Sequence, residues 1–147
     1  MGAPAGRLGR AEGGFTLVEL LVVLLILGVL VAIAVPAFFS QRDKARDAEA
    51  KLQVRTVQTA IETYATDHNG SYSGADPATL GQIEPALRDI PSSYLTIQVA
   101  GNSGKYKVSV DTPAGNQFSI RRAVDDSLSY PCTNAGSGGC PSSGFWG

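Results

Sequence analysis

Hydrophobic positions are distributed very unevenly along this chain. From Phe15 to Phe39 nearly every residue is apolar, and the stretch from Leu20 to Val35 contains no charge. An α-helix rises about 1.5 Å per residue, so about 20 such residues cross the hydrocarbon core of a membrane. Residues 15–39 are therefore predicted to form a transmembrane helix.

From Ser40 the pattern changes to that of an amphipathic helix. Apolar residues recur three and four positions apart, with charged residues between them. The helix is predicted to continue to about Asp67, so that residues 40–68 form the spine of a head, with Gly70 as its C-terminal cap and His68 in a surface capping role. The apolar stripe contains Ala50, Val54, Val57, Ile61 and Tyr64; the polar face contains Arg46, Glu49, Lys51, Arg55 and Glu62.

Turn-forming residues dominate the segment that follows. Residues 69–93 are predicted to be a connecting region with a short helix over Pro77–Leu87. Asp76 is expected to cap the start of this helix and Pro85 to interrupt it.

Residues 94–131 alternate between apolar and polar positions, as strands do. The short turns at 101–104 and 111–116 favour antiparallel pairing. An α+β fold is therefore expected, with a long N-terminal helix packed on a small antiparallel meander of three or four strands. The predicted strands are Tyr94–Val99, Lys105–Val110 and Gln117–Val124.

Residues 132–147 are predicted to form a C-terminal disulfide loop and tail. Cys132 and Cys140 are the two cysteines of the chain, and the glycine-rich segment between them allows pairing if this end faces an oxidising compartment. Phe145 and Trp146 either pack on the head or contact a neighbouring molecule, and packing is the preferred interpretation. With His68 as the single histidine, no metal site and no cofactor are expected.

Glu19 is the one charged residue inside the apolar segment. A carboxylate at membrane depth costs roughly 2.5–3.5 kcal/mol on insertion scales. The positive end of the helix macrodipole offsets only about 0.3–1 kcal/mol of this. Glu19 therefore needs a cationic partner.

Three interpretations of residues 1–39 compete. A secretory signal peptide fits the A-x-A-like Ala32–Ala34, but its apolar core is usually shorter and is not interrupted by a glutamate. A plain single-pass anchor leaves Glu19 unexplained. In the third interpretation, cleavage between Gly14 and Phe15 creates an amino group on Phe15 that can pair with Glu19.

The stretch "GFTLVELLVVLLILGVLVAIAVP" at Gly14–Pro36 resembles the N-terminal signature of type IV pilins and type II secretion pseudopilins. This resemblance implies that residues 1–14 are a leader removed by a prepilin peptidase and that Phe15 is then N-methylated. It also implies that Glu19 is the assembly residue. Thr16, part of the same signature, is expected to cap the first helical turn through its hydroxyl.

Assembly follows from the resemblance and from packing. Glu19 is expected to meet the Phe15 amine of the next subunit in a homo-oligomeric helical filament, with local self-pairing as the alternative. The resemblance also implies an inner-membrane assembly platform and an assembly ATPase, since the chain has no phosphate-binding loop of its own. Pro36 is expected to kink the helix, and Gly28 either adds to this kink or permits close helix contact.

Charge before the span indicates its orientation. Arg7 and Arg10 precede it, whereas the charges after Phe39 nearly cancel, so the N-terminus is predicted to lie in the cytoplasm. A single-pass protein of the cytoplasmic membrane would thus precede a cell-surface filament.

The function expected from the resemblance is that of a pilin, a structural subunit for adhesion, motility or DNA uptake. The alternative is a minor pilin or a secretion pseudopilin that primes a filament or drives secretion. Pro36 and the small disulfide loop favour the pilus, and Glu19 argues against a tip subunit.

Two further function classes are disfavoured. An enzyme is not expected, because no Ser/His/Asp grouping or nucleophile motif is recognisable. The net charge of −1 does not indicate a dedicated nucleic-acid binder. DNA contact is retained as a minor hypothesis, based on a patch of Lys105, Lys107, Arg121 and Arg122 on adjacent predicted strands.

Overall fold

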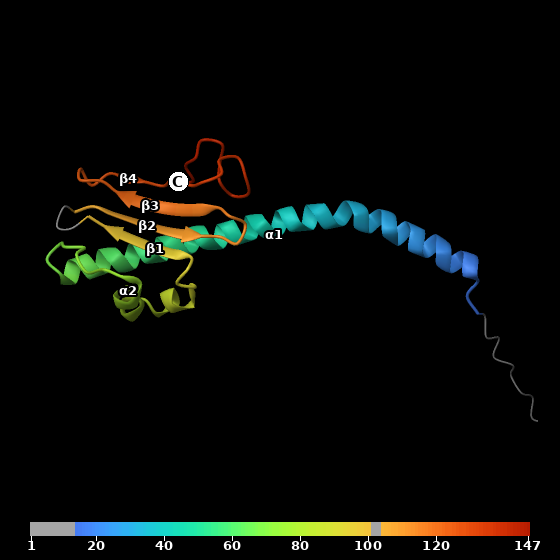
Figure 1. Cartoon of the computed structure of the whole chain (residues 1–147), viewed down its shortest axis with the longest axis horizontal. Coiled ribbons are helices and arrows are strands. Elements are labelled where there is room, and N and C mark those ends of the chain that lie inside the picture. Colours follow the sequence, from blue (N-terminus) through green and yellow to red (C-terminus); the bar gives the residue numbers. More distant parts are fainter. Residues whose placement is uncertain (1–13, 101–103) are drawn as a thin grey trace, which may run out of the picture. The chain divides into compact units, whose positions relative to one another are not determined.

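The computed structural model describes residues 14–100 and 104–147. These residues belong to two compact units that divide after Phe38, and each unit is described by itself. The predicted leader, apart from Gly14, and most of the predicted turn at 101–104 lie outside the described residues. The elements are α1 (Leu17–Asp67), α2 (Pro77–Ile83), a 3-10 helix η1 (Pro85–Asp89), β1 (Leu95–Val99), β2 (Tyr106–Asp111), β3 (Gln117–Arg122) and β4 (Leu128–Ser129) (Figure 1).

Capping residues define both ends of α1. The Thr16 hydroxyl accepts a hydrogen bond of 3.2 Å from the backbone N–H of Glu19, as expected of a cap. At the other end, Asn69 and Gly70 have positive φ angles of 55° and 82°. The Gly70 N–H donates to the Ala65 carbonyl at 2.7 Å, which closes the last turn.

His68 also caps this end of α1. Its Nδ1 lies 2.7 Å from the Tyr64 carbonyl, and its ring stacks on the Tyr64 ring with centroids 3.9 Å apart. Because a carbonyl only accepts, Nδ1 is the donor in this bond. The predicted capping role of His68 is confirmed.

Helix α1 continues through both residues that were expected to weaken it. Pro36 lies inside the helix, and Gly28 is helical with no atom near the position of a Cβ. Neither residue melts the helix in the single subunit. A bend at these residues within a filament stays a prediction.

The short helices follow their predicted signals. Asp76 caps α2 by accepting a 2.7 Å bond from the Thr79 N–H, while the Thr79 hydroxyl accepts a bond from the Asp76 N–H. The interruption falls at Glu84, where the chain turns into η1. The sequence therefore predicted the start of this short helix and its interruption near Pro85 correctly.

The four strands form an antiparallel meander in the order β1-β2-β3-β4. Val108 stands opposite Ile97 on one side and Ile120 on the other, so one face of the sheet is apolar. Figure 1 shows the C-terminal part of α1 lying along the sheet. The core joins the predicted helix stripe, Ala50, Val54, Val57, Ile61 and Tyr64, to the predicted strand positions Leu95, Tyr106, Val108, Val110, Phe118 and Ile120.

The third strand is shorter than predicted. It ends at Arg122, because the Ala123 N–H donates to the Ser127 carbonyl at 2.9 Å and Asp126 takes a positive φ of 64°. Val124 therefore lies in a tight turn between β3 and β4 rather than in a strand.

Candidate assembly site

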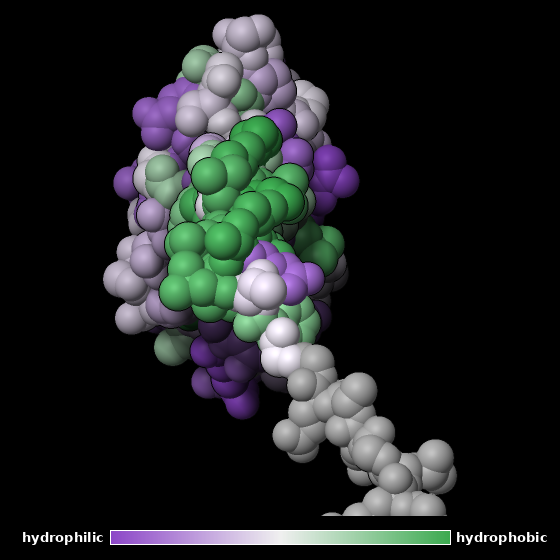
Figure 2. Space-filling view, turned by 90° about the vertical axis from the view of Figure 1, so that its right-hand side faces the viewer, coloured by the Kyte–Doolittle hydropathy of each residue, from purple (hydrophilic) through white to green (hydrophobic). Residues whose placement is uncertain are grey.

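The N-terminal part of α1 exposes apolar side chains on all sides. Every residue from Phe15 to Phe39 is exposed. Figure 2, viewed from the right-hand side of Figure 1, shows mostly hydrophobic residues gathered toward the viewer. Among the described residues, α1 is the one helix long and apolar enough to cross a membrane. A surface of this kind requires lipid or other apolar helices around it.

Glu19 lies in the first turn of this helix. Its backbone N–H is engaged by Thr16, and its carboxylate takes part in no ion pair within residues 14–100 and 104–147. Phe15, one turn earlier, is 84% exposed. The structure thus places the predicted assembly residues at one helix end, where the carboxylate is accessible to an external cation.

Asp47 is a buried acid that sequence reasoning assigned to no site. It is fully buried, and its Oδ2 accepts bonds of 2.7 Å from Asn116 Nδ2 and from the Gly139 N–H. Its Oδ1 has no hydrogen-bond partner among the described residues. A Cβ on Gly138 would collide with the Asp47 carboxylate, so the loop can approach α1 this closely only because glycine stands there.

Asp47 was detectable in the sequence. It lies three residues before Ala50, in register with the apolar stripe, so the helix turns it toward the head. Lys51, predicted to lie on the polar face, also turns inward: its Nζ donates to the Gly139 carbonyl at 2.6 Å. Through hydrogen bonds to Gly139, Asp47 and Lys51 together hold the C-terminal loop against α1.

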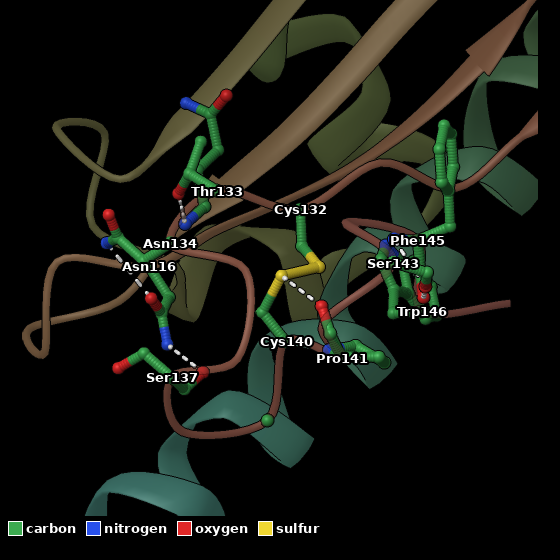
Figure 3. The surroundings of a disulfide bond; sticks show 12 residues. Asn116, Cys132, Thr133, Asn134, Ser137, Cys140, Pro141, Ser143, Phe145 and Trp146 are labelled. Carbon is green, nitrogen blue, oxygen red and sulfur yellow. Dashed lines mark hydrogen bonds between the residues drawn. A yellow bond between two sulfur atoms is a disulfide. The ribbon is translucent and has the colours of Figure 1, made fainter.

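The predicted disulfide is present and closes this loop. Cys132 and Cys140 are bonded, with their Cα atoms 5.8 Å apart (Figure 3). Asn116, in the turn between β2 and β3, binds this loop: its Nδ2 donates to the Ser137 carbonyl at 3.3 Å, and its Oδ1 accepts from Asn134 Nδ2 at 3.1 Å. The disulfide therefore holds the segment that reaches Asp47.

The two aromatic residues of the tail behave differently. Trp146 packs edge-on against Phe118 and Tyr130, and its Nε1 donates to the Ser119 carbonyl at 3.2 Å. Phe145 remains 53% exposed. The expected packing is confirmed for Trp146 and is wrong for Phe145, because the Pro131–Phe145 bridge directs alternate residues to opposite sides.

Glu62 is a second residue that was assigned wrongly to the polar face. Its carboxylate accepts bonds from the hydroxyls of Tyr72 and Tyr106 at 2.7 and 2.8 Å, and Arg122 Nη1 lies 2.7 Å from both of its oxygens. Burial acts to raise the pKa of Glu62, but the three hydrogen bonds and the charge of Arg122 outweigh burial and lower it. Burial and the bond to Glu62 raise the pKa of Tyr72 to about 12.

The predicted cationic patch is only partly formed. Arg122 points inward to Glu62 and also pairs with Asp126 at 2.9 Å, so it is not available to DNA. Lys107 and Arg121 are opposite each other on β2 and β3, on the outer face of the sheet. Lys105, Lys107, Arg121 and Arg122 all line one hollow, but the guanidinium of Arg122 is bound by Glu62.

No cluster of three or more His, Cys, Asp or Glu side chains suited to a metal ion occurs in the described part of the chain. The expectation that the chain needs no metal stays a prediction.

Comparison with known proteins centres on the N-terminal segment. The family model for the prokaryotic N-terminal methylation motif matches residues 9–35. The type II secretion system core protein G of Pseudomonas aeruginosa is 39% identical over 59 residues, which cover 40% of this chain and 42% of that protein. The type IV narrow pilus major component PilA5 of Thermus thermophilus is 38% identical over 80 residues, which cover 45% of this chain and 68% of that protein.

The fimbrial protein of Neisseria meningitidis serogroup B is 35% identical over 98 residues, which cover 63% of this chain and 58% of that protein. The chain thus spans about half the length of the secretion and fimbrial relatives, 42% and 58%. No solved structure matches it.

Proposed function

The chain belongs to the family of type IV pilins and type II secretion pseudopilins, and we propose that it is a structural subunit of a pilus-like filament rather than an enzyme. The observation that carries this proposal is the position of Glu19, a carboxylate in the first turn of a helix segment whose apolar side chains are all exposed. A bundle of identical helices would enclose this surface once the subunit leaves the membrane.

Maturation supplies the partner that Glu19 lacks. A prepilin peptidase cuts after Gly14, and methylation of the new N-terminus keeps the Phe15 amine cationic. The ammonium of the neighbouring subunit then attracts Glu19 strongly, because opposite charges interact strongly in low-dielectric surroundings. Pairing between subunits offsets the roughly 2.5–3.5 kcal/mol burial cost of the carboxylate, and it fixes the axial register of each incoming subunit.

The cellular route follows from the same segment. Before assembly the subunit is a single-pass protein of the cytoplasmic membrane with its N-terminus inside. Transfer from lipid to filament needs work, which an assembly ATPase supplies through an inner-membrane platform. After assembly the head, beginning near Ser40, lies at the cell surface.

A role in protein secretion is the second candidate. The similarity to a type II secretion core protein supports it, as the similarity to a narrow-pilus component supports the pilus. We place the pilus first because Pro36 lies within α1 and the disulfide loop forms a defined surface. Adhesion, motility and DNA uptake are the roles open to such a pilus.

The decisive experiment replaces Glu19 by glutamine in the full chain. Glu49→Gln is the matched control, since Glu49 is an exposed glutamate of the same helix whose removal changes the net charge equally. Sheared filaments and the membrane fraction are then quantified, and mass spectrometry reads the N-terminus. We expect Glu19→Gln to be cut before Phe15 and methylated, yet to yield at least about tenfold less filament, while Glu49→Gln assembles normally.

Undiminished assembly of Glu19→Gln would show that the ion pair is not required. A mature N-terminus other than Phe15 would remove the ammonium from the scheme altogether. Sheared surface filaments rich in this subunit indicate the pilus, whereas recovery only in the envelope together with loss of exoprotein release in a deletion strain indicates the secretion role.

A further inference from the structure

Contacts between heads in a filament are constrained by symmetry. Identical subunits related by a repeated rotation and rise meet through two different surfaces, because a self-complementary contact closes into a dimer and cannot propagate. If this chain forms a filament, its head must therefore carry two separate and mutually complementary patches.

One such patch is a hollow between α1 and the C-terminal tail. It is lined by Ala48, Lys51, Leu52, Arg55 and Trp146, and we call it the α1 hollow. Leu52 is 67% exposed. The guanidinium of Arg55 lies over the Trp146 ring at 5.3 Å from its centroid, and it has no carboxylate partner among the described residues. The α1 hollow is thus apolar and cationic.

The other patch consists of the tight turn between β3 and β4 and the first residue of β4, residues 123–128, which we call the β3–β4 turn. Val124 is 63% exposed and Leu128 is 40% exposed. Between them Asp125 is exposed, and the Ser127 hydroxyl and N–H donate to its carboxylate at 2.7 and 3.1 Å. These bonds lower the pKa of Asp125 and hold its carboxylate in place. The β3–β4 turn is thus apolar, acidic and well defined.

We propose that the β3–β4 turn of one subunit docks into the α1 hollow of the next copy. Val124 and Leu128 would cover Leu52 and the exposed part of Trp146, and Asp125 would pair with Arg55. This inference rests on the proposed filament, since it assigns the surfaces through which the heads meet.

The charge pairing is specific to these two residues. The neighbouring Asp126 is already held by Arg122 at 2.9 Å, and Lys51 is already bonded to the Gly139 carbonyl. Arg55 and Asp125 are therefore the charged groups of the two patches that gain an ion-pair partner on contact. Both lie beside exposed apolar side chains, and partial exclusion of water there strengthens their attraction.

Cysteine cross-linking tests the contact directly in assembled filaments. Both native cysteines are engaged in the disulfide, so Leu52→Cys and Val124→Cys introduce the free thiols. Filaments of the full chain carrying both substitutions are treated with a short bifunctional thiol reagent. We expect a ladder of multimers from the doubly substituted chain and monomers from each single variant, because the contact joins unlike surfaces.

Charge reversal tests the same contact without cysteines. Arg55→Glu and Asp125→Arg should each reduce filament yield about tenfold, and the doubly reversed chain should recover most of it, because the pair is restored with its signs exchanged. Arg121→Glu and Asp89→Arg are the matched controls, since both residues are exposed on other surfaces of the head.

The outcomes separate this inference from the proposed function. Wild-type filaments with no ladder from the doubly substituted chain, or with reversals no worse than their controls, would overturn the docking contact and leave the filament standing. Losses from Arg55→Glu that Asp125→Arg does not recover would assign the α1 hollow to a different partner. A wild-type chain that forms no filaments would refute the proposed function itself.

Discussion

Replacing Asp47 by alanine removes the acceptor that holds the C-terminal loop against α1. Two donors, the buried Asn116 Nδ2 and the half-buried Gly139 N–H, lose a carboxylate oxygen at 2.7 Å. A hydrogen bond to a charged group contributes about 1.5 kcal/mol at the lower end of its range, so we expect the free energy of unfolding to fall by about 3 kcal/mol. Asp47→Asn keeps a carbonyl acceptor in the same place and should lose about half as much.

Trp146 provides the assay, because it is the single tryptophan of the chain and its ring centroid lies 6.0 Å from Lys51 Nζ, which binds the Gly139 carbonyl of the same loop. Urea unfolding of the full chain in a mild detergent is followed by tryptophan fluorescence, and the midpoint and slope give the free energy of unfolding. Glu49→Ala is the control. Glu49 is exposed, and its carboxylate accepts a single 3.4 Å bond from Gln53 within the described part of the chain. Its loss should therefore change stability by less than about 0.5 kcal/mol.

Two results would refute this reasoning. A loss below about 1 kcal/mol for Asp47→Ala would mean that the two donors find other partners easily. Equal losses for Asp47→Asn and Asp47→Ala would mean that the negative charge, and not the acceptor geometry, stabilises the loop.

Three further predictions concern the head. Serine at both Cys132 and Cys140 should lower the free energy of unfolding by roughly 2–3 kcal/mol, as loop closure over this short separation implies, and the same urea titration measures it. Because folding lowers the pKa of Glu62, its contribution to stability is present above the unfolded value of 4.5 and is lost as the pH falls below it. The stability of Glu62→Gln should therefore fall less steeply than that of the wild type between about pH 5 and 3, and an equal slope would contradict this. Because the pKa of Tyr72 is raised from 10.0 to about 12, its contribution is present below pH 10 and is lost above it, so Tyr72→Phe should flatten the loss of stability in thermal melts between pH 10 and 12.

Much of the assembly site could be predicted because its signals are local. Gly14, Phe15 and Glu19 lie within six consecutive residues, and the apolar segment that follows them is recognisable without any fold. Glycine and threonine at a helix start act through their immediate neighbours, so the Thr16 cap was predicted correctly. Periodicity likewise identified α1 and three of the strands.

The head's polar contacts could not be predicted in the same way, because their partners are distant in the chain. Glu62 meets Arg122 across 60 residues, and Asp47 meets Gly139 across 92. Charge led to the assignment of Glu62, Lys51 and Arg122 to solvated surfaces, since an isolated charge is usually exposed. Strand alternation alone predicts that the Arg122 side chain points inward, because Arg122 lies two residues after the inward-facing Ile120.

The sequence by itself determined the N-terminal helix, its apolar surface, the single carboxylate within it and the cleavage signature, since each depends on residues a few positions apart. Tertiary structure alone decided which acids become buried acceptors, which aromatic residue of the tail packs, and that Val124 and Asp125 project together from a turn. The physical reason is that burial and hydrogen-bond geometry arise only when remote segments meet: the β-sheet brings Arg122 to Glu62, and the disulfide brings Gly139 to Asp47.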